Sequence, residues 1–251
     1  MRHAQVTFLR EIGRLNASMS ALHAIEGIDL SRCAEYWAGW NALRGAFAPG
    51  DPVLDVGSYR SPWPLFVAGR GAVSLLLDLD RTVSGQLAWA RRAGASLQPI
   101  LGSALEVPLR AGSLAVVTAI SVVEHIAGDG DRRALAGLGQ ALRPGGAAFV
   151  SVPYAQVARE GKWQRWYQHW YDDDAFANRL VAPSGLVIEE DGYLLGRRLG
   201  RFADVWYRLP ARLRHALSWS HVPLFAAADL AGSRDDARVR WALLRKPSEG
   251  A

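Results

Sequence analysis

The chain has 251 residues, of which half are apolar and 21% are charged. This composition is typical of a large globular domain with a full core, and it excludes an intrinsically disordered chain. The single cysteine excludes an internal disulfide framework and a cysteine-based zinc cluster, and no apolar run approaches the ~20 residues of a membrane-spanning helix. Because the N-terminus shows no secretory pattern, we expect a cytoplasmic protein, and we expect no metal site.

The net charge of +5 is carried almost entirely by arginine, since only Lys162 and Lys246 are lysines. The sequence has no zinc-finger spacing, helix-turn-helix pattern or RNP-like strand of the kind that accompanies nucleic-acid binding. A basic balance alone more often serves solubility, so we expect no nucleic-acid partner.

The first 48 residues are predicted to be helical. Apolar residues recur there at spacings of three and four, first at Val6, Leu9, Ile12 and Leu15 and again between Tyr36 and Phe47. The cluster Pro49-Gly-Asp-Pro52 then ends the helix. We therefore expect an N-terminal helical extension over residues 1–48, followed by a second unit over residues 49–251.

From residue 53 onward, short apolar runs alternate with segments of helix length. Strands are predicted at 53–56, 73–77, 98–101, 114–120 and 147–152, and helices at 62–68, 82–93 and 131–142. The last of these helices is expected to close with the turn Arg143-Pro-Gly-Gly146. Continuous apolar strands separated by helices predict an α/β fold with a parallel sheet covered on both faces.

Polar residues follow these strands, at the edge where a parallel sheet binds its ligands. Asp55 and Gly57 end the first strand, Asp78 ends the second, and Ser121 follows the fourth. A carboxylate about 20 residues after the first strand is where nucleotide pockets bind a ribose diol. Gly57 lacks the further glycines of G-x-G-x-x-G, which argues against a pyrophosphate-bearing dinucleotide and favours a cofactor without phosphates.

The segment 155–180 follows the fifth strand and is dense in aromatic residues. Flat aromatic faces suit sugars and other rings, and a neighbouring arginine suits a phosphate or a carboxylate. We therefore predict a substrate cap whose contacts with the acceptor are Tyr154, Trp163, Trp166 and Trp170. A lid that only packs over the crevice is the alternative.

Residues 197–236 show one apolar and one arginine-rich face, as in an amphipathic helix. The simplest interpretation is a helical cap inserted between two further strands, at 186–195 and 238–244. The alternative is contact with an anionic membrane surface through residues 197–220, because arginine-lined amphipathic helices also lie on lipid.

Four stretches together resemble the class I S-adenosylmethionine-dependent methyltransferases, in particular the ubiquinone-biosynthesis type. They are Val53-Leu-Asp-Val-Gly57, Leu77-Asp-Leu-Asp80, residues 108–126 and Leu142-Arg-Pro-Gly-Gly146. The resemblance implies a Rossmann-like, mostly parallel sheet of seven strands in the order 3-2-1-4-5-7-6, with helices on both faces. Its last strand would be antiparallel.

The resemblance also implies S-adenosyl-L-methionine as the cofactor. Asp55 and Gly57 would face its methionine part, Asp78 its ribose, Ser103 its adenine and Ser121 its sulfonium. The adjoining residues of this predicted site are Ser58, Tyr59, Leu79 and Ala104. Tyr59 and Ser61 stand where the family has glycines, and Ser103 and Ala115 replace family aspartates.

These features predict a methyltransferase that acts on an oxygen of a small-molecule acceptor, with a sugar or glycan precursor favoured. An oxygen acceptor must lose a proton, and His125, His169 and Tyr167 are the candidate catalytic residues. The alternatives are a methyltransferase that acts on a lipid or quinone at a membrane surface, and a non-catalytic methyltransferase-like binding protein. Ser121-Val-Val-Glu124 stands where amide- and base-N-methylating enzymes have Asn/Asp-Pro-Pro-Tyr/Phe, which argues against those types.

Overall fold

The structure is a computed structural model that describes residues 2–19, 28–58, 61–81, 94, 96–163, 166–210, 213 and 229–248. Two expectations lie outside these ranges: the helix at 82–93 and the place of Tyr59 in the cofactor site. None of the described helices is both long enough and apolar enough to span a membrane.

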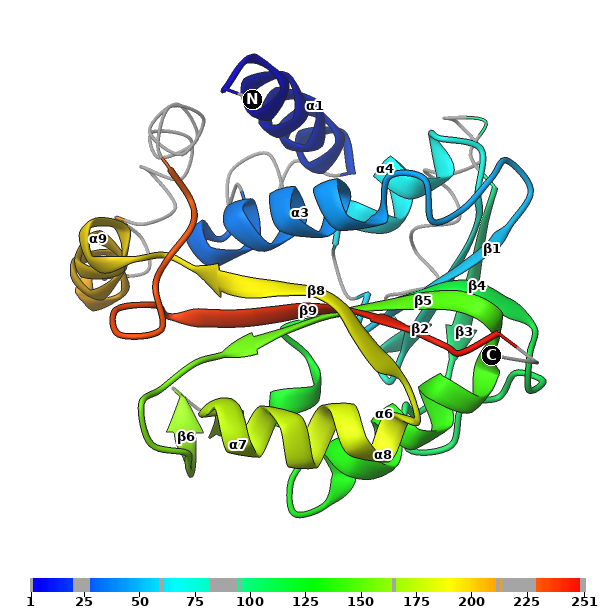
Figure 1. The fold of residues 1–251 in the computed structure, drawn as a ribbon. Helices are drawn as coiled ribbons and strands as arrows, with labels where there is room; N and C mark the ends of the chain where they lie inside the picture. Colours follow the sequence, from blue (N-terminus) through cyan, green and yellow to red (C-terminus); the bar gives the residue numbers. More distant parts are fainter. Residues whose placement is uncertain are drawn as a thin grey trace.

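A seven-stranded sheet forms the centre of the molecule (Figure 1). Its strands are β1 (Pro52–Val56), β2 (Val73–Asp78), β3 (Leu97–Leu101), β4 (Leu114–Ile120), β5 (Leu142–Pro153), β8 (Val187–Leu194) and β9 (Val239–Arg245). Their order is β3-β2-β1-β4-β5-β9-β8, and β9 runs antiparallel to both of its neighbours. This confirms the expected order 3-2-1-4-5-7-6 with the last strand of the chain reversed.

Helices cover both faces of the sheet (Figure 1). One face carries α1 (Arg2–Met19), α3 (Leu30–Leu43) and α4 (Trp63–Ala68). The other carries α6 (Gly130–Ala141), α7 (Asp173–Phe176) and α8 (Ala182–Ser184), with a π-helical turn at 177–181 between the last two. Because the strands alternate their side chains between the faces, each layer of helices has its own hydrophobic cluster.

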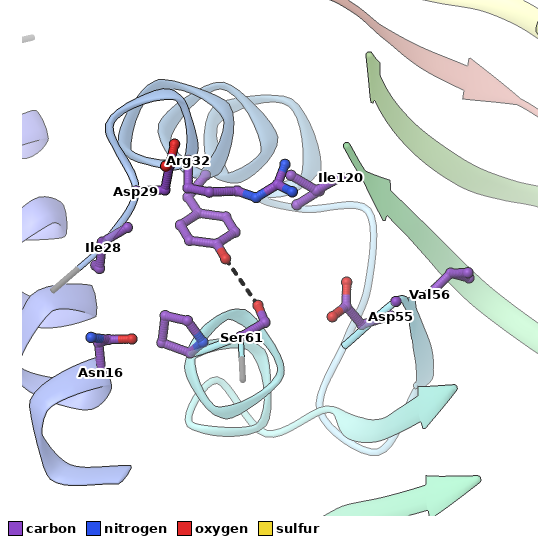
Figure 2. Close-up of a pocket in the computed structure, with 11 residues that line it drawn as sticks. Asn16, Ile28, Asp29, Arg32, Asp55, Val56, Ser61 and Ile120 are labelled. Atoms are coloured by element: carbon purple, nitrogen blue, oxygen red, sulfur yellow. Dashed lines mark hydrogen bonds between the residues drawn. The ribbon is translucent and has the colours of Figure 1, made fainter. Parts of the chain in front are cut away.

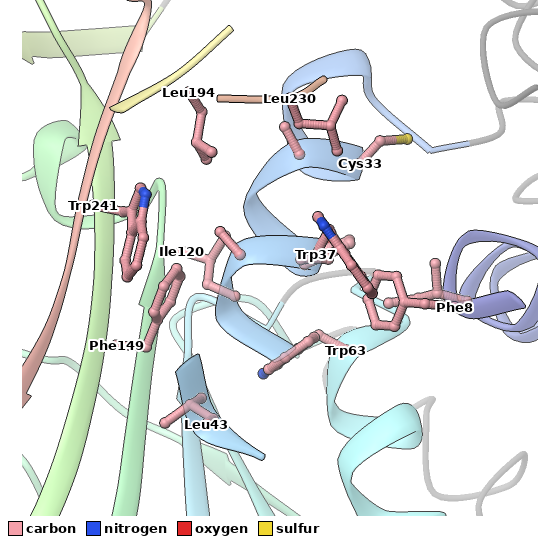
Figure 3. Packing of buried hydrophobic residues seen from close by; sticks show 14 of the residues in the cluster. Phe8, Cys33, Trp37, Leu43, Trp63, Ile120, Phe149, Leu194, Leu230 and Trp241 are labelled. Atoms are coloured by element: carbon pink, nitrogen blue, oxygen red, sulfur yellow. The ribbon is translucent and has the colours of Figure 1, made fainter. Parts of the chain in front are cut away.

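The N-terminal helices share the main core of the molecule (Figure 3). Phe8 of α1 packs against Trp37 of α3, with ring centroids 5.4 Å apart. Gly39 lets α3 approach the sheet, because a Cβ atom there would lie 3.2 Å from the Phe149 ring of β5. That ring stacks in turn on Trp241 of β9. Residues 30–43 therefore cover the sheet directly, and the domain boundary at residue 48 stays a prediction.

The turn predicted at Arg143–Gly146 is wrong, because these residues lie inside β5. The pairing of β4 with β5 jumps from Leu114↔Leu142 to Val116↔Ala147, so the extra residues bulge out of the ladder. Gly145 takes a φ of 73°, and its N–H donates to the carbonyl of Lys246 at 3.0 Å. These hydrogen bonds to the chain after β9 keep the segment in the sheet where the proline and glycines indicate a turn.

The aromatic segment after β5 folds as a separate antiparallel hairpin. Its strands are β6 (Arg159–Trp163) and β7 (Trp166–Trp170). A short 3-10 helix, η2 (Val123–His125), follows β4 and lies against β7. The amphipathic segment begins with α9 (Arg197–Arg208), and most of its residues from 211 to 228 lie outside the described ranges.

Candidate cofactor and acceptor site

The ends of β2 and β3 bring the predicted ribose and adenine residues together. The strands pair in parallel, and the N–H of Gly102 donates to the backbone oxygen of Asp78 at 3.0 Å. Ser103 follows directly, so its hydroxyl and the Asp78 carboxylate lie at the same edge of the sheet. Leu79 is largely exposed and Ala104 half-buried beside them. This edge offers a carboxylate, a hydroxyl and an apolar side chain to a bound nucleoside.

A cavity of about 170 Å³ opens beside this edge, between the end of β1, the end of β4 and helices α1 and α3 (Figure 2). Its polar lining residues are Asn16, Asp29, Arg32, Tyr36, Asp55 and Ser61. The Tyr36 hydroxyl lies 3.0 Å from the Ser61 hydroxyl, so α3 is joined to the loop after β1. Of the predicted cofactor residues, Asp55 and Gly57 lie in this wall.

Asp55 is a buried carboxyl group in the cavity wall. Its Oδ1 accepts a hydrogen bond from Thr118 at 2.6 Å, and the Ser58 hydroxyl donates to the Asp55 backbone oxygen at 2.6 Å. Burial raises its pKa to about 7, although the hydrogen bonds and Arg32 act in the opposite direction. Asp55 is therefore about half ionised at neutral pH, and a ligand cation beside it would favour the charged form.

The structure gives a steric reason for glycine at position 57. Its φ is 69°, and a Cβ atom there would lie 2.3 Å from Cγ2 of Val122. The loop after β4 thus fills the space that a side chain at this position would need. Close approach of the cofactor was the reason expected from the sequence, and that contact stays a prediction.

Arg32 is held at the cavity wall by a buried network. Its guanidinium donates to Glu35 at 3.0 Å and to the backbone oxygen of Ser121 at 2.9 Å. The fully buried Glu35 carboxylate also accepts the hydroxyls of Ser121 and Ser151. Ser121 has a φ of 42°, a left-handed conformation that costs energy for a residue other than glycine. These bonds fix the direction of Arg32 and link α3 to the end of β4.

The sequence analysis missed the residues that the N-terminal helices contribute to the cavity. These residues are Asn16, Asp29, Arg32 and Tyr36, and Glu35 holds Arg32 from behind the cavity wall. One signal was present: Arg32 and Glu35 stand three residues apart within an otherwise apolar helix, where a buried charge requires a partner.

The cavity fits the amino-acid end of S-adenosylmethionine. That end carries a carboxylate and an ammonium group, and the wall offers the Arg32 cation together with the Asp55 carboxyl group. Arg32 suits the carboxylate, because a guanidinium binds it through two parallel hydrogen bonds. With Asp78 at the neighbouring strand end, the described residues supply partners for both the amino-acid and the ribose parts.

His125 lies in η2, directly after β4. Its Nδ1 is 2.8 Å from the backbone oxygen of Tyr167, and a carbonyl oxygen can only accept, so Nδ1 carries the proton. Nε2 therefore keeps a free lone pair. Burial lowers the pKa of His125, and the field of Arg32 adds to this, so the ring is neutral at pH 7. The structure thus presents a neutral imidazole with its tautomer fixed.

Glu124 is a buried carboxyl group next to His125. Its Oε1 lies 3.8 Å from Nε2 of His125, and among the described residues its Oε2 has no hydrogen-bond partner. Burial raises the pKa of Glu124 to about 8. A buried, incompletely bonded carboxyl group is costly and marks a candidate functional position, which the sequence analysis did not single out.

The other two catalytic candidates bind each other on the hairpin. The Tyr167 hydroxyl lies 2.8 Å from Nε2 of His169, whose Nδ1 lies 3.4 Å from Glu160. His169 is buried, and burial together with Glu160 raises the pKa of Tyr167 to about 12. Tyr167 is therefore a neutral phenol at pH 7 and a poor base. Catalytic roles for these two residues stay predictions.

The four predicted substrate residues fall into two pairs. Trp163 and Trp166 stand exposed at the end of the hairpin. Trp170 lies under the guanidinium of Arg159, 4.8 Å from the ring centre, and Tyr154 is buried. Trp163 and Trp166 are thus the most exposed of the four, Trp170 is half-buried, and contacts of all four with an acceptor stay predictions.

Trp163 is linked to the cavity wall through α9. The Trp163 ring meets the Tyr207 ring edge to face, with centroids 5.7 Å apart. The Tyr207 hydroxyl donates to Oδ1 of Asp29 at 2.5 Å, and Asp29 lines the cavity. The hairpin, α9 and α3 thus form one continuous wall, which joins the aromatic segment to the cofactor end of the sheet.

Comparison with known proteins gives a family match and several structures of the same fold. Residues 54–150 match the family described as methyltransferase domain. Geranyl diphosphate C-methyltransferase from Streptomyces coelicolor A3(2) shares the fold with a TM-score of 0.60 at 14% identity, over 84% of this chain and 76% of that one. A Burkholderia thailandensis 1,6-didemethyltoxoflavin-N1-methyltransferase shares the fold with a TM-score of 0.56 at 16% identity, over 84% of this chain and 81% of that one.

The fold is not restricted to methyl transfer. The cyclase SpnF is similar with a TM-score of 0.58 at 18% identity, over 85% of this chain and 81% of that one. No curated protein sequence matches the chain significantly.

The sheet order and the residues at its carboxyl edge define a class I methyltransferase fold. The methyltransferase-domain family matches residues 54–150, and the solved structures extend the likeness of fold to 84% of the chain.

Proposed function

We propose that the protein transfers a methyl group to a hydroxyl of a small-molecule acceptor, with a sugar-containing acceptor favoured. S-adenosylmethionine supplies the electrophilic methyl group. Arg32, Asp55 and Asp78 orient it, and the helices above the cavity limit the access of water. The chain must then align the acceptor oxygen and take its proton.

The observation that carries the choice of oxygen is the state of His125. A neutral imidazole with its lone pair on Nε2 is a suitable general base, because its pKa lies near or below neutrality. Nε2 lies 3.8 Å from Oε1 of Glu124, whose raised pKa of about 8 keeps that carboxyl group mostly protonated at pH 7, so His125 itself is the base here. A neutral amine acceptor would not need such a base.

The preference for a sugar rests on the hairpin end and its neighbours. Trp163 and Trp166 present flat apolar faces, and Asp29 provides a carboxylate at the cavity wall. Aromatic faces beside a hydrogen-bonding carboxylate suit a ring that carries hydroxyl groups.

Two alternatives remain open to test. The similarity to a geranyl diphosphate methyltransferase keeps a lipid-type acceptor as a candidate. The similarity to a cyclase keeps a protein that uses this fold without methyl transfer as another.

The test compares His125→Asn with the parent protein. Asparagine can still donate to the Tyr167 oxygen but lacks the Nε2 lone pair. We expect kcat for methylation of a sugar acceptor to fall by about 10²–10⁴-fold and the acidic limb of the pH–rate profile to disappear. The affinity for S-adenosylhomocysteine, measured by calorimetry, should not change.

His3→Asn, on the exposed surface of α1, is the matched control and should behave as the parent. A His125→Asn variant with the parent's rate and pH profile would refute the role of His125. A parent protein that binds neither S-adenosylmethionine nor S-adenosylhomocysteine would refute the proposed function as a whole.

A further inference from the structure

Helix α9 has two sharply different faces. Leu199, Ala203 and Trp206 are buried against the main core. The exposed residues of the helix are Arg197, Arg198, Arg201, Asp204, Val205 and Arg208. The one carboxylate, Asp204, is paired with Arg238 at 2.8 Å. The outer face of α9 is therefore strongly cationic.

Large apolar side chains stand exposed in and beside this cationic face. Val205 is 60% exposed within it. The Trp163–Tyr207 contact places the end of the hairpin against the last turn of α9, and Trp166 there is 56% exposed. Figure 1 shows α9 and β6 at the same side of the molecule. We call the outer face of α9 and the hairpin end with Lys162, Trp163 and Trp166 the basic-aromatic face.

We infer that the basic-aromatic face binds the surface of an anionic lipid bilayer. Tryptophan rings prefer the headgroup level, where an apolar ring and a polar N–H are both accommodated. Arginine side chains reach lipid phosphates while their alkyl stems cover apolar surface. Exposed tryptophans at the hairpin end, together with an exposed valine and surplus arginines on the neighbouring helix α9, combine the apolar and cationic contacts of interfacial association.

The exposed apolar side chains favour a bilayer over other anionic partners. An acidic protein or polyanion would be attracted to the same arginines, but it would gain little from Trp166 and Val205, which a bilayer can bury. The cavity wall reaches the basic-aromatic face through Asp29 and Tyr207. A membrane-held acceptor would thus be presented to the cavity, a consequence that rests on the proposed function, whereas the lipid contact itself does not.

The test measures co-sedimentation of the full chain with vesicles of phosphatidylcholine alone or mixed with phosphatidylglycerol. We expect binding only to the mixed vesicles, weakened but not abolished by added salt, because apolar insertion is not screened. The double variant R201E/R208E should lower the partition coefficient by more than about tenfold. Trp166→Ala should remove the part that resists salt.

The matched control is R132E/R133E, which makes the same change in charge on exposed positions of α6. It should bind vesicles nearly as well as the parent. Equal loss in both double variants would refute the inference in favour of net charge, and so would binding to heparin without binding to mixed vesicles. Unchanged thermal melting and S-adenosylhomocysteine affinity would separate loss of lipid binding from misfolding and from failure of the proposed function.

Discussion

Binding of the cofactor should release a proton from Asp55. The carboxyl group lines the cavity, and burial raises its pKa to about 7. A ligand ammonium or sulfonium close to it would favour the ionised form and lower this pKa in the complex. Because the free protein holds the proton more tightly than the complex does, affinity must rise with pH.

The size of the effect follows from the pKa. With a value near 7, Asp55 is mostly neutral at pH 6 and mostly ionised at pH 8. If the complex requires the ionised form, binding releases about half a proton at pH 7. Affinity for S-adenosylmethionine then increases about tenfold from pH 6 to pH 8.

The free protein should show the matching change in stability. A carboxyl group with a raised folded-state pKa stabilises the protein fully below its unfolded pKa of 3.8, and this contribution is lost as pH rises through about 7. The rise in the pKa of Asp55 from 3.8 to about 7 corresponds to at most about 4 kcal/mol of unfolding free energy. Asp55→Asn lacks this group and should lose less stability between pH 5 and pH 8.

Calorimetry at pH 7 in two buffers of different ionisation enthalpy counts the released protons. The parent should give a buffer-dependent enthalpy, and Asp55→Asn should give a smaller dependence. The reasoning fails if parent and variant release the same number of protons, or if the affinity of the parent is the same at pH 6 and pH 8.

Two further substitutions test the packing and the buried charges around the cavity. Gly57→Ala should lower the free energy of unfolding, measured in urea, by about 2–4 kcal/mol. Adding Val122→Ala should recover the part of this loss that is due to the steric clash, but not the part that is due to the positive φ. An unchanged unfolding midpoint for Gly57→Ala would contradict this prediction. Arg32→Met should cost about 3–5 kcal/mol because Glu35 stays buried without its cation. R32M/E35Q should recover stability but not S-adenosylhomocysteine affinity, and recovery of both would refute a binding role for Arg32.

The sheet could be predicted because its strands are continuous apolar runs. Residues 114–120 were predicted as a strand with the bounds that β4 has, since seven buried residues leave no other periodicity to consider. The strand order came from four motifs at family spacing. The wrong prediction of a turn at Arg143–Gly146 has a local cause, because proline and glycine usually mark a turn. Hydrogen bonds with Lys246, directly after β9, keep these residues in β5.

The cavity wall could not be predicted, because helical periodicity identifies a buried face but not what covers it. The recurrence of apolar residues between Tyr36 and Phe47 indicated an apolar helix face, and the structure packs Tyr36 and Trp37 into the main core. Arg32 and Glu35 then contact Ser121 and Ser151, residues 86 to 116 positions later in the chain. Neither contact has a signature in local sequence.

The proposed acceptor side of the site is assembled from distant segments, whereas the predicted cofactor residues lie on neighbouring strand ends. The cofactor motifs lie between residues 53 and 126, on strand ends whose geometry the sheet fixes. Asp29, Trp163 and Tyr207 come from a helix cap, a hairpin end and a helix end, and a hydrogen bond and a ring contact join them. Because these contacts lie outside the sheet, their side chains can set the acceptor chemistry while the strand ends keep the methyl donor in place.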